Sequence, residues 1–492
     1  MREHIMKQIY EKLSDLKLLD YIVILAVVVT NLSAFILCFN RVFTYDESYT
    51  IALAQRTIPE IIDITSQDVH TPFYYIIINV LCAVTNLPIF FVAKFLSLVF
   101  YDLYLLVGGK FVKKLYGKKV MLYWLLFSAM MPPMIIQTST ARMYTIGLFF
   151  VTASLGLAYK CYTEGKWYNW VLFSISSLCG VYVHTFTMIS LFFLYLIFAA
   201  VILRKKQYKK LVPYCISGAT VALLYIPWLM VLYHQMARWA GYEEGWSNTI
   251  VPVSLEQFKL WVFEWFSALE RPQIGSVFFG VFVLGITCFF AVKYAIQKRD
   301  GKPLVGLGLC ILITGIATII GLLLVPCFFG RYILNLFGAL YLMFAIGMEQ
   351  CSVKTIRVMI CVGMLGVGAF AIADEHVIDN ENGLKQYENF MDKFLEEDDI
   401  VIGDTYLCLM MSIYYPENQY MTYGYKPLCT PFECEAFKSW DQLEGVDEFW
   451  YLQIVDLRAA DFSAQFEEWD CLSFTHSHYD FVLKQMTRKL EE

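Results

Sequence analysis

The sequence predicts an all-α, polytopic membrane protein with a small soluble α/β domain at its C-terminal end. Of its 492 residues 58% are hydrophobic, above the usual share for a soluble domain, and the mean hydropathy is +0.54. Charge divides the chain: residues 1–374 carry 19 acids and 30 bases, whereas 375–492 carry 25 acids and 8 bases. We therefore expect a transmembrane domain over 1–374 and an acidic soluble domain over 375–492.

Apolar runs of about 20 residues, long enough to cross a bilayer, predict about eleven transmembrane helices. The run 72–86 is too short to span, and we expect it to lie along the membrane surface as an amphipathic helix. The predicted spans are 19–39, 88–109, 120–138, 142–160, 167–183, 185–203, 211–233, 275–292, 304–326, 331–349 and 357–374.

Basic loops predict the orientation, because lysine and arginine favour the cytoplasmic side. Eleven spans place the clusters at 110–119, 204–210, 293–302 and 354–357 inside the cell. The N-terminus is then cytoplasmic and the C-terminal domain extracytoplasmic. Twelve spans would instead place that domain in the cytoplasm.

The C-terminal domain carries both helix and strand patterns. An amphipathic helix is expected over 386–396, and strands over 400–404, 419–423 and 449–455. This mixture predicts a small α/β domain. Its acidic charge argues against nucleic acid as a partner.

The predicted topology gathers charged and imidazole side chains at the extracytoplasmic face. Carboxylates beside hydrocarbon are costly and usually functional. Alternatively, each side chain merely flanks its helix and extends towards the headgroups. Because the residues come from loops spread over most of the chain, we interpret them as lining one cavity, and the tryptophan-rich loop 232–275 as an interfacial cover for it. The set comprises Asp46, Glu47, Asp68, His70, Arg142, His184, His234, Arg238 and Arg331.

Two motifs lie in the first outer loop, over 40–87. An adjacent pair of acids, Asp46-Glu47, directly follows the first span, and Asp68-Val69-His70-Thr71-Pro72 comes later in the loop. In this membrane context the chain resembles glycosyltransferases of the GT-C fold. More narrowly, it is similar to the family of protein O-mannosyltransferases and lipid A aminoarabinose transferases, in which Thr71 would replace a proline.

Later segments extend this resemblance over roughly residues 19–350. They are Ala141-Arg142-Met143-Tyr144, His184 near a helix end, and Arg331-Tyr332. Gly330 stands where an acid is frequent in the family. This departure puts an ion pair formed by that position in doubt.

The resemblance implies transfer of a sugar from a polyprenyl-phosphate donor to a hydroxyl of an envelope glycan, lipid or protein. The hydroxyl must lose its proton as it attacks the anomeric carbon, so a carboxylate can serve as general base. We predict that Asp46 is this base and that Glu47 orients the base or the acceptor. Alternatively, Asp46 caps a helix that starts at Glu47, and Glu47 is an ordinary acid of its first turn.

The leaving phosphate gains negative charge, and arginine binds phosphate oxygens through two hydrogen bonds. We predict this role for Arg142 and Arg331, with the two histidines as lesser donors. Aromatic side chains are expected to shape the sugar pocket, although tyrosines also form interfacial belts. The predicted substrate-binding residues are Asp68, His70, Tyr74, Arg142, Tyr144, His184, Arg331 and Tyr332.

No metal or other cofactor is expected. Asp46, Glu47, Asp68 and His70 could ligate a divalent cation, as the oligosaccharyltransferase branch of the fold does. A monophosphate flanked by arginines has less need of a metal than a diphosphate has.

Two other classes of function fit parts of the sequence. A transporter or flippase of lipid-linked sugars would place ionisable groups near the middle of the bilayer, and Asp102 lies within a predicted span. A non-catalytic scaffold for envelope assembly would have the acidic domain over 375–492 as its working part.

Overall fold

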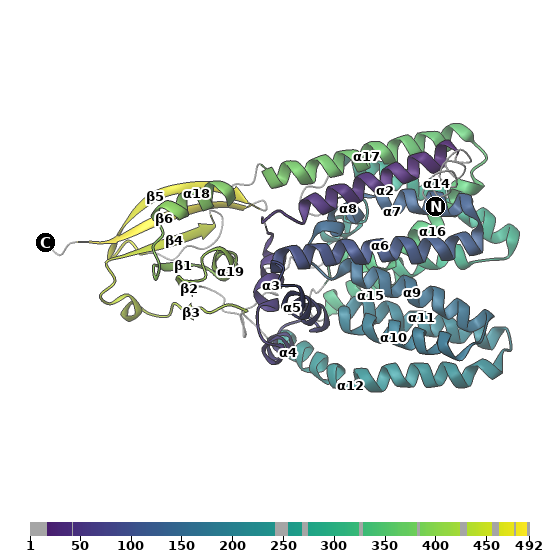
Figure 1. Cartoon of the computed structure of the whole chain (residues 1–492), viewed down its shortest axis with the longest axis horizontal. Coiled ribbons are helices and arrows are strands. Elements are labelled where there is room, and N and C mark those ends of the chain that lie inside the picture. Colours follow the sequence, from purple (N-terminus) through teal and green to yellow (C-terminus); the bar gives the residue numbers. More distant parts are fainter. Residues whose placement is uncertain are drawn as a thin grey trace, which may run out of the picture.

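A bundle of long helices carries a six-stranded sheet beyond one of its ends (Figure 1). The computed structural model describes residues 17–41, 43–241, 254–267, 274–323, 328–380, 384–423, 431–454, 462–476 and 479–489. The helices of the bundle are α2 (Leu18–Leu37), α6 (Ile89–Tyr116), α7 (Lys118–Met130), α8 (Pro132–Ser139), α9 (Tyr144–Thr163), α10 (Trp167–Val183), α11 (Thr185–Arg204), α12 (Leu211–Gly241), α14 (Ile274–Lys298), α15 (Val305–Leu323), α16 (Phe337–Gln350) and α17 (Lys354–Asn380). Short 3-10 helices η1 (Tyr208–Lys210), η3 (Lys302–Leu304) and η4 (Gly330–Leu336) precede α12, α15 and α16.

The long apolar helices confirm an integral, multi-pass membrane protein. Within the described residues, nine helices are long and apolar enough to span a membrane, or ten if α7 and α8, bent by 63° at their junction, form one span. Each of the eleven predicted spans overlaps a helix of the bundle.

The count of eleven depends on α10, which has 17 residues and reaches about 26 Å at 1.5 Å per residue. Its first turn follows Glu164, which pairs with Lys114 at 3.5 Å, and its C-cap His184 lies beside Tyr144 at the opposite end of α9. The helix therefore runs the length of its neighbour. The number of spans and their orientation stay predictions.

Glycines allow several of these helices to approach closely. A Cβ on Gly347 of α16 would lie 2.2 Å from the carbonyl oxygen of Thr287 in α14, and one on Gly306 of α15 would lie 2.3 Å from the carbonyl carbon of Ala339. Such backbone contacts are typical of helices packed within a membrane, where small residues increase van der Waals contact.

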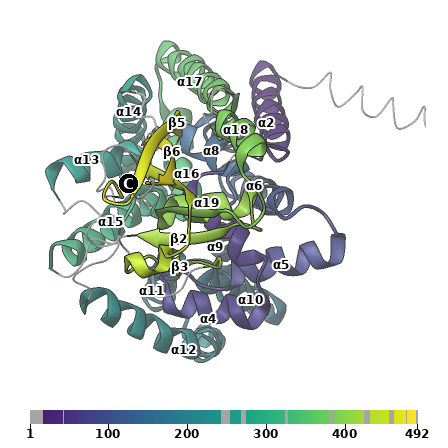
Figure 2. The same ribbon diagram turned by 90° about the vertical axis from the view of Figure 1, so that its left-hand side faces the viewer.

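The first outer loop folds into three short helices, α3 (Tyr45–Ala54), α4 (Ile58–Gln67) and α5 (Phe73–Thr85). They lie at the end of the bundle that faces the sheet (Figure 1), and α5 lies across this end (Figure 2). With 13 residues α5 is too short to span, as predicted, and it ends at Asn86 in the left-handed conformation.

Of the segment 232–275, interpreted as an interfacial cover, the structure describes 232–241, 254–267 and 274–275, and most of these residues are helical. Helix α12 continues past residue 233 to Gly241, so His234 and Arg238 lie on a helix. Helix α13 (Leu255–Phe263) then packs on η4. Trp261 and Trp265 are only 2% and 5% exposed, and the ring of Trp261 lies 4.9 Å from that of Phe328. The cover prediction is therefore wrong for these two side chains, which form part of the core.

The sheet has the order β3-β2-β1-β4-β6-β5. Strands β1 (Ile400–Asp404), β2 (Gln419–Tyr423) and β4 (Glu448–Ile454), with helix α18 (Leu384–Phe394), confirm the predicted elements. Strand β1 pairs in parallel with β2 and β4, and β2 pairs in parallel with β3 (Glu435–Ala436). The sheet ends with two antiparallel strands, β5 (Phe466–His476) and β6 (Tyr479–Arg488), of which β6 pairs with β4. The domain also contains helices α19 (Thr405–Tyr414) and η5 (Trp440–Leu443).

Helix α19 connects the sheet to the first outer loop. It packs on α3, and Tyr414 at its end donates a hydrogen bond to the carbonyl of Arg41 at 2.6 Å. Leu409 and Trp450 belong to the same apolar cluster as Tyr75 and Ala141. The sheet domain is therefore packed on the helix that carries Asp46.

Candidate active site

The start of α3 is fixed by a reciprocal cap. The side-chain oxygen of Thr44 accepts the N–H of Glu47 at 3.3 Å, and Oε2 of Glu47 accepts the N–H of Thr44 at 3.1 Å. The cap is therefore Thr44, and the alternative that Asp46 caps the helix is wrong. Asp46 lies in the first turn, where its carboxylate is free to point into the site.

Glu47 connects α3 to the turn that carries Arg142. Its side chain is only 5% exposed, and Oε1 accepts the backbone N–H of Ala141 at 2.8 Å. Ser97 of α6 holds the same turn by donating to the carbonyls of Thr140 at 2.7 Å and Arg142 at 3.1 Å. Both oxygens of Glu47 are thus occupied by hydrogen bonds from the protein.

Asp46 lies between two arginines from distant parts of the chain. Its Oδ2 accepts a hydrogen bond from Nη2 of Arg331 at 2.9 Å, and its Oδ1 lies 3.8 Å from Nη2 of Arg142. Burial alone would raise the pKa of Asp46, but the positive charges of Arg142 and Arg331 outweigh this effect and leave the pKa below its ordinary value. The carboxylate is therefore ionised at neutral pH.

Arg142 is almost completely enclosed, with 3% of its surface exposed. Its Nη1 donates to the backbone carbonyl of Asp46 at 3.1 Å and reaches the hydroxyl of Thr50 at 3.4 Å. Its Nη2 lies 3.5 Å from Nε2 of His70. These contacts hold the guanidinium in one orientation beside the carboxylate.

The second motif of the outer loop meets the first. Asp68 accepts a hydrogen bond from the hydroxyl of Tyr49 at 2.6 Å, and its carboxylate lies 3.9 Å from His70 Nε2. Burial lowers the pKa of His70 to about 4, although Asp68 acts in the opposite direction. His70 is therefore neutral at pH 7, and one of its ring nitrogens can donate a hydrogen bond while the other accepts one.

Aromatic rings form one wall of the site. The ring of Tyr332 stacks on that of Tyr144 at 6.3 Å and lies 5.0 Å from that of His184. Burial lowers the pKa of His184 to about 3, and its Nδ1 accepts the N–H of Phe186 at 3.2 Å. Tyr74 is fully buried and packs against Tyr75 at 5.4 Å, behind the charged residues.

Several polar atoms of this site are buried without a hydrogen-bond partner. Among the described residues these include Nε of Arg142, Nε of Arg331 and the hydroxyls of Tyr75 and Tyr144. An unpaired buried donor is costly, so such atoms mark strained or ligand-binding positions. The two guanidinium Nε atoms and the two tyrosine hydroxyls together favour an anionic ligand.

The predicted site residues do not form a metal centre in the part of the chain that the structure describes. No group of three or more His, Cys, Asp or Glu side chains lies within reach of a common ion there. The carboxylates of Asp46 and Glu47 are already engaged, with arginine and with backbone amides. That the protein uses no metal stays a prediction.

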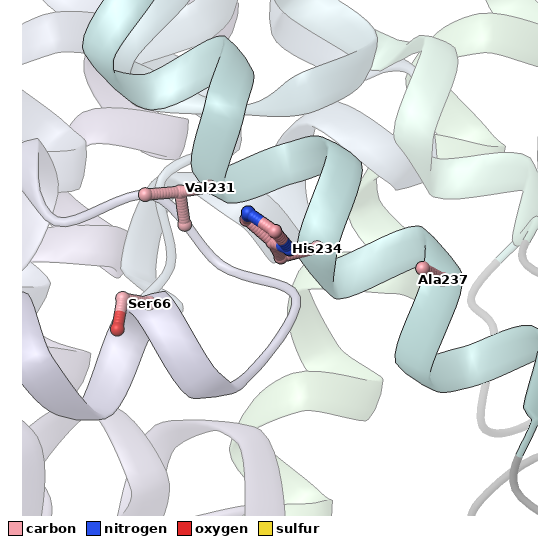
Figure 3. A pocket seen from close by; sticks show the side chains of 4 residues that line it. All are labelled: Ser66, Val231, His234 and Ala237. Atoms are coloured by element: carbon pink, nitrogen blue, oxygen red, sulfur yellow. The ribbon is translucent and has the colours of Figure 1, made fainter.

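His234 lies on α12. With Val231 and Ala237 of the same helix and Ser66 of α4 it lines a separate hollow of about 560 Å³ (Figure 3). Nearby, Gln235 donates to the carbonyl of Thr65 at 2.7 Å and so connects α12 to the outer loop.

Three contributors were not predicted from the sequence. Tyr49 and Tyr75 come from helices of the outer loop and contact Asp68 and His70. Glu264, at the end of α13, accepts the N–H of Arg331 at 2.8 Å. Only the proximity of the tyrosines to the two motifs could have indicated them in advance.

Comparison with solved structures identifies the fold. The chain superposes on apo ArnT from Cupriavidus metallidurans with a TM-score of 0.66 at 10% identity, covering 94% of this chain and 97% of that one. For ArnT bound to undecaprenyl phosphate the TM-score is 0.61 at 11% identity, with the same coverage of both chains. Scans against protein-family models and curated protein sequences give no match. The chain therefore has the GT-C fold that its sequence motifs predicted.

Proposed function

We propose that the chain is a membrane glycosyltransferase that moves a sugar from a polyprenyl-phosphate donor to an acceptor hydroxyl at the extracytoplasmic face. The observation that carries this proposal is the position of Asp46 between Arg142 and Arg331, beside buried donors without partners. The reaction requires a carboxylate that can take the acceptor proton, and two arginines that can bind the leaving phosphate, within one small site. The shared fold with ArnT, which has been solved with undecaprenyl phosphate, supports it.

In the proposed reaction the acceptor oxygen forms a bond to the anomeric carbon while Asp46 takes the hydroxyl proton. The bond from that carbon to the phosphate oxygen breaks, and the electron pair leaves with the lipid phosphate. Arg142 and Arg331 neutralise the charge that develops there. As Arg331 turns its hydrogen bond from Asp46 towards the phosphate, it releases the carboxylate, whose basicity then rises at the step that needs it.

The remaining predicted residues are proposed to shape the substrate pocket. Neutral His70, held near Asp68, offers one donor and one acceptor next to Arg142. Tyr144, His184 and Tyr332 present ring faces on which a sugar can pack. We propose that Tyr74 supports this layer from behind, and that Glu47 acts by positioning the Ala141–Arg142 turn.

The charged cluster lies at the ends of helices, and this position favours the enzyme over the transporter. A transporter site is expected near the bilayer midplane, on broken helices. Here the interacting side chains come from the first turn of α3, the turn before α9, and η4. All three lie where the bundle meets the sheet domain.

The purified full chain in nanodiscs provides the test. It is expected to bind undecaprenyl phosphate and to bind undecaprenol, the same lipid without phosphate, at least about tenfold more weakly, because charge-assisted hydrogen bonds to phosphate contribute roughly 1.5–3 kcal/mol. It is also expected to consume a polyprenyl-phosphate sugar when given envelope lipids as acceptors. Equal affinity for the two lipids would contradict the proposal.

We also propose that the sheet domain lies outside the cytoplasm, which the basic loops predict. Cysteine introduced at the exposed Asp441 is expected to react on intact cells with a membrane-impermeant reagent, above the level of the unsubstituted chain. Cysteine at Lys206, also exposed but in a basic loop, is the matched control and should react only after lysis. The reverse pattern would overturn the orientation.

A further inference from the structure

Glu264 lies beside the site on a segment that the proposed mechanism does not use. It follows the last residue of α13, and its Oε2 accepts the backbone N–H of Arg331 at 2.8 Å. The carboxylate also interacts with the backbone N–H of Gly330. One carboxylate thereby fixes the turn at the start of η4. The direction of the Arg331 side chain, which reaches Asp46 at 2.9 Å, depends on that turn.

Gly330 makes this contact possible. A Cβ at this position would lie 2.6 Å from Oε2 of Glu264 and 2.4 Å from the carbonyl oxygen of Trp261. Any larger residue would therefore push α13 away from η4. The carboxylate of Glu264 therefore reaches the turn from the residue that follows α13.

We propose that Glu264 is the proton-linked counter-ion of Arg331, holding the turn that carries this arginine and taking up a proton from water when an anionic phosphate binds there. The inference rests on the proposed donor site. A phosphate that pairs with Arg331 removes much of the positive field that favours an ionised Glu264. It also adds a like charge, so the neutral carboxyl becomes the more stable form.

The titration ranges of the surrounding groups support this assignment. Burial raises the pKa of Glu264 to about 7, against the opposing effects of Arg331 and the two backbone amides. Of the charged groups near it, Arg331 on η4 acts on the Glu264 carboxylate through its positive charge, and Asp46 on α3 is bonded to the Arg331 side chain. Asp46 stays ionised near pH 7, whereas His70 and His184, with pKa values of about 4 and about 3, stay neutral. Glu264 is thus the group in this set that changes charge near neutrality.

The experiment is titration calorimetry of the full chain in nanodiscs with undecaprenyl phosphate, in two buffers of different ionisation enthalpy. Near pH 7 the wild type is expected to take up about half a proton more per bound lipid than Glu264→Gln, because a group close to its pKa is about half protonated beforehand. Glutamine keeps an acceptor for the amides and loses the charge. Glu433→Gln makes the same chemical change at a side chain that is 95% exposed, and should match the wild type.

Proton uptake in Glu264→Gln equal to that of the wild type would overturn the coupling while leaving the donor site intact. Failure of the wild type to bind the lipid would contradict the proposed function and the coupling with it. Should the variant not fold, Asp46→Asn replaces it, because asparagine at position 46 cannot take up a proton. Net proton uptake near pH 7 that persists in Asp46→Asn supports Glu264, whereas loss of that uptake contradicts the coupling. The lipid phosphate itself, with a second pKa of about 6, can only release protons when it meets arginine.

Discussion

Asparagine in place of Asp46 is expected to lower the rate of sugar transfer by about 10²–10⁴-fold, the usual loss when general acid–base assistance is removed. Asparagine has nearly the same shape and can still accept a hydrogen bond from Arg331, but its amide cannot take the acceptor proton. Because Thr44 caps α3, the substitution leaves the start of the helix unchanged. The measurement is initial-rate transfer from a polyprenyl-phosphate sugar in nanodiscs.

Donor binding should respond to this variant in the opposite direction. Asp46 competes with the lipid phosphate for two guanidiniums, so its neutral replacement is expected to tighten binding of undecaprenyl phosphate. The ligand-free protein should be less stable, since the buried Arg142 and the partly buried Arg331 lose the charge of Asp46. Slower turnover with tighter binding separates loss of a base from simple damage to the site.

The pH profile gives an independent check on Asp46. The pKa of this carboxyl lies below its ordinary value, so its ionised form is complete at neutral pH. Activity that depends on it should be lost only as the pH falls below about 4, the ordinary range of aspartic acid. A rate that declines with acid at higher pH would report a group other than Asp46 and Glu264, because protonation of Glu264 is proposed to accompany donor binding and not to oppose it.

Two comparison variants locate the base. Glu47→Gln replaces a carboxylate whose two oxygens accept from Thr44 and Ala141, so it should reduce stability more than it affects the chemical step. Asp68→Asn should weaken the contact with Tyr49 and have a smaller effect on rate than Asp46→Asn. Near-normal turnover in Asp46→Asn together with inactivity of Asp68→Asn would move the base to Asp68.

Much of the helical bundle could be predicted because apolar length is a local property of the sequence. Runs such as 19–39 and 185–203 need no tertiary information to be identified as membrane helices, and α2 and α11 confirm them. Strands β5 and β6 were not predicted. Glutamate, aspartate and lysine interrupt their apolar alternation, and the pairing of the two strands overrides this weak local preference.

For the site, the sequence predicted only the side of the membrane on which each residue lies. Because an even number of predicted spans separates Asp46 from Arg331, the sequence places both residues on the same side of the membrane. Their contact at 2.9 Å, however, joins residues 285 positions apart and depends on how the helices pack. The role of Glu264 follows from the approach of α13 to Gly330, which no local pattern encodes. The tryptophans near Glu264 led us to expect a segment at the membrane surface. In the structure Trp261 and Trp265 are instead buried in the core.

Lysine in place of Arg142 is expected to reduce kcat/KM by roughly 10–100-fold, although the charge is kept, because loss of one charge-assisted hydrogen bond to phosphate costs about 1.5–3 kcal/mol. Arg142 contacts the Asp46 carbonyl, Thr50 and His70 through its two terminal nitrogens and still has an unpaired Nε. An ammonium is a compact point charge and cannot reproduce this planar arrangement.

The loss should be visible in donor affinity as well as in turnover, since the arginine is proposed to contact phosphate both before and after the bond breaks. Arg204→Lys is the matched control, because Arg204 is exposed at the far end of α11 and its replacement should leave both quantities unchanged. Binding of undecaprenyl phosphate and initial-rate transfer are measured on the same nanodisc preparations. Wild-type turnover and unchanged affinity in Arg142→Lys would remove Arg142 from the phosphate-binding role and leave Arg331 as the arginine that binds the leaving group.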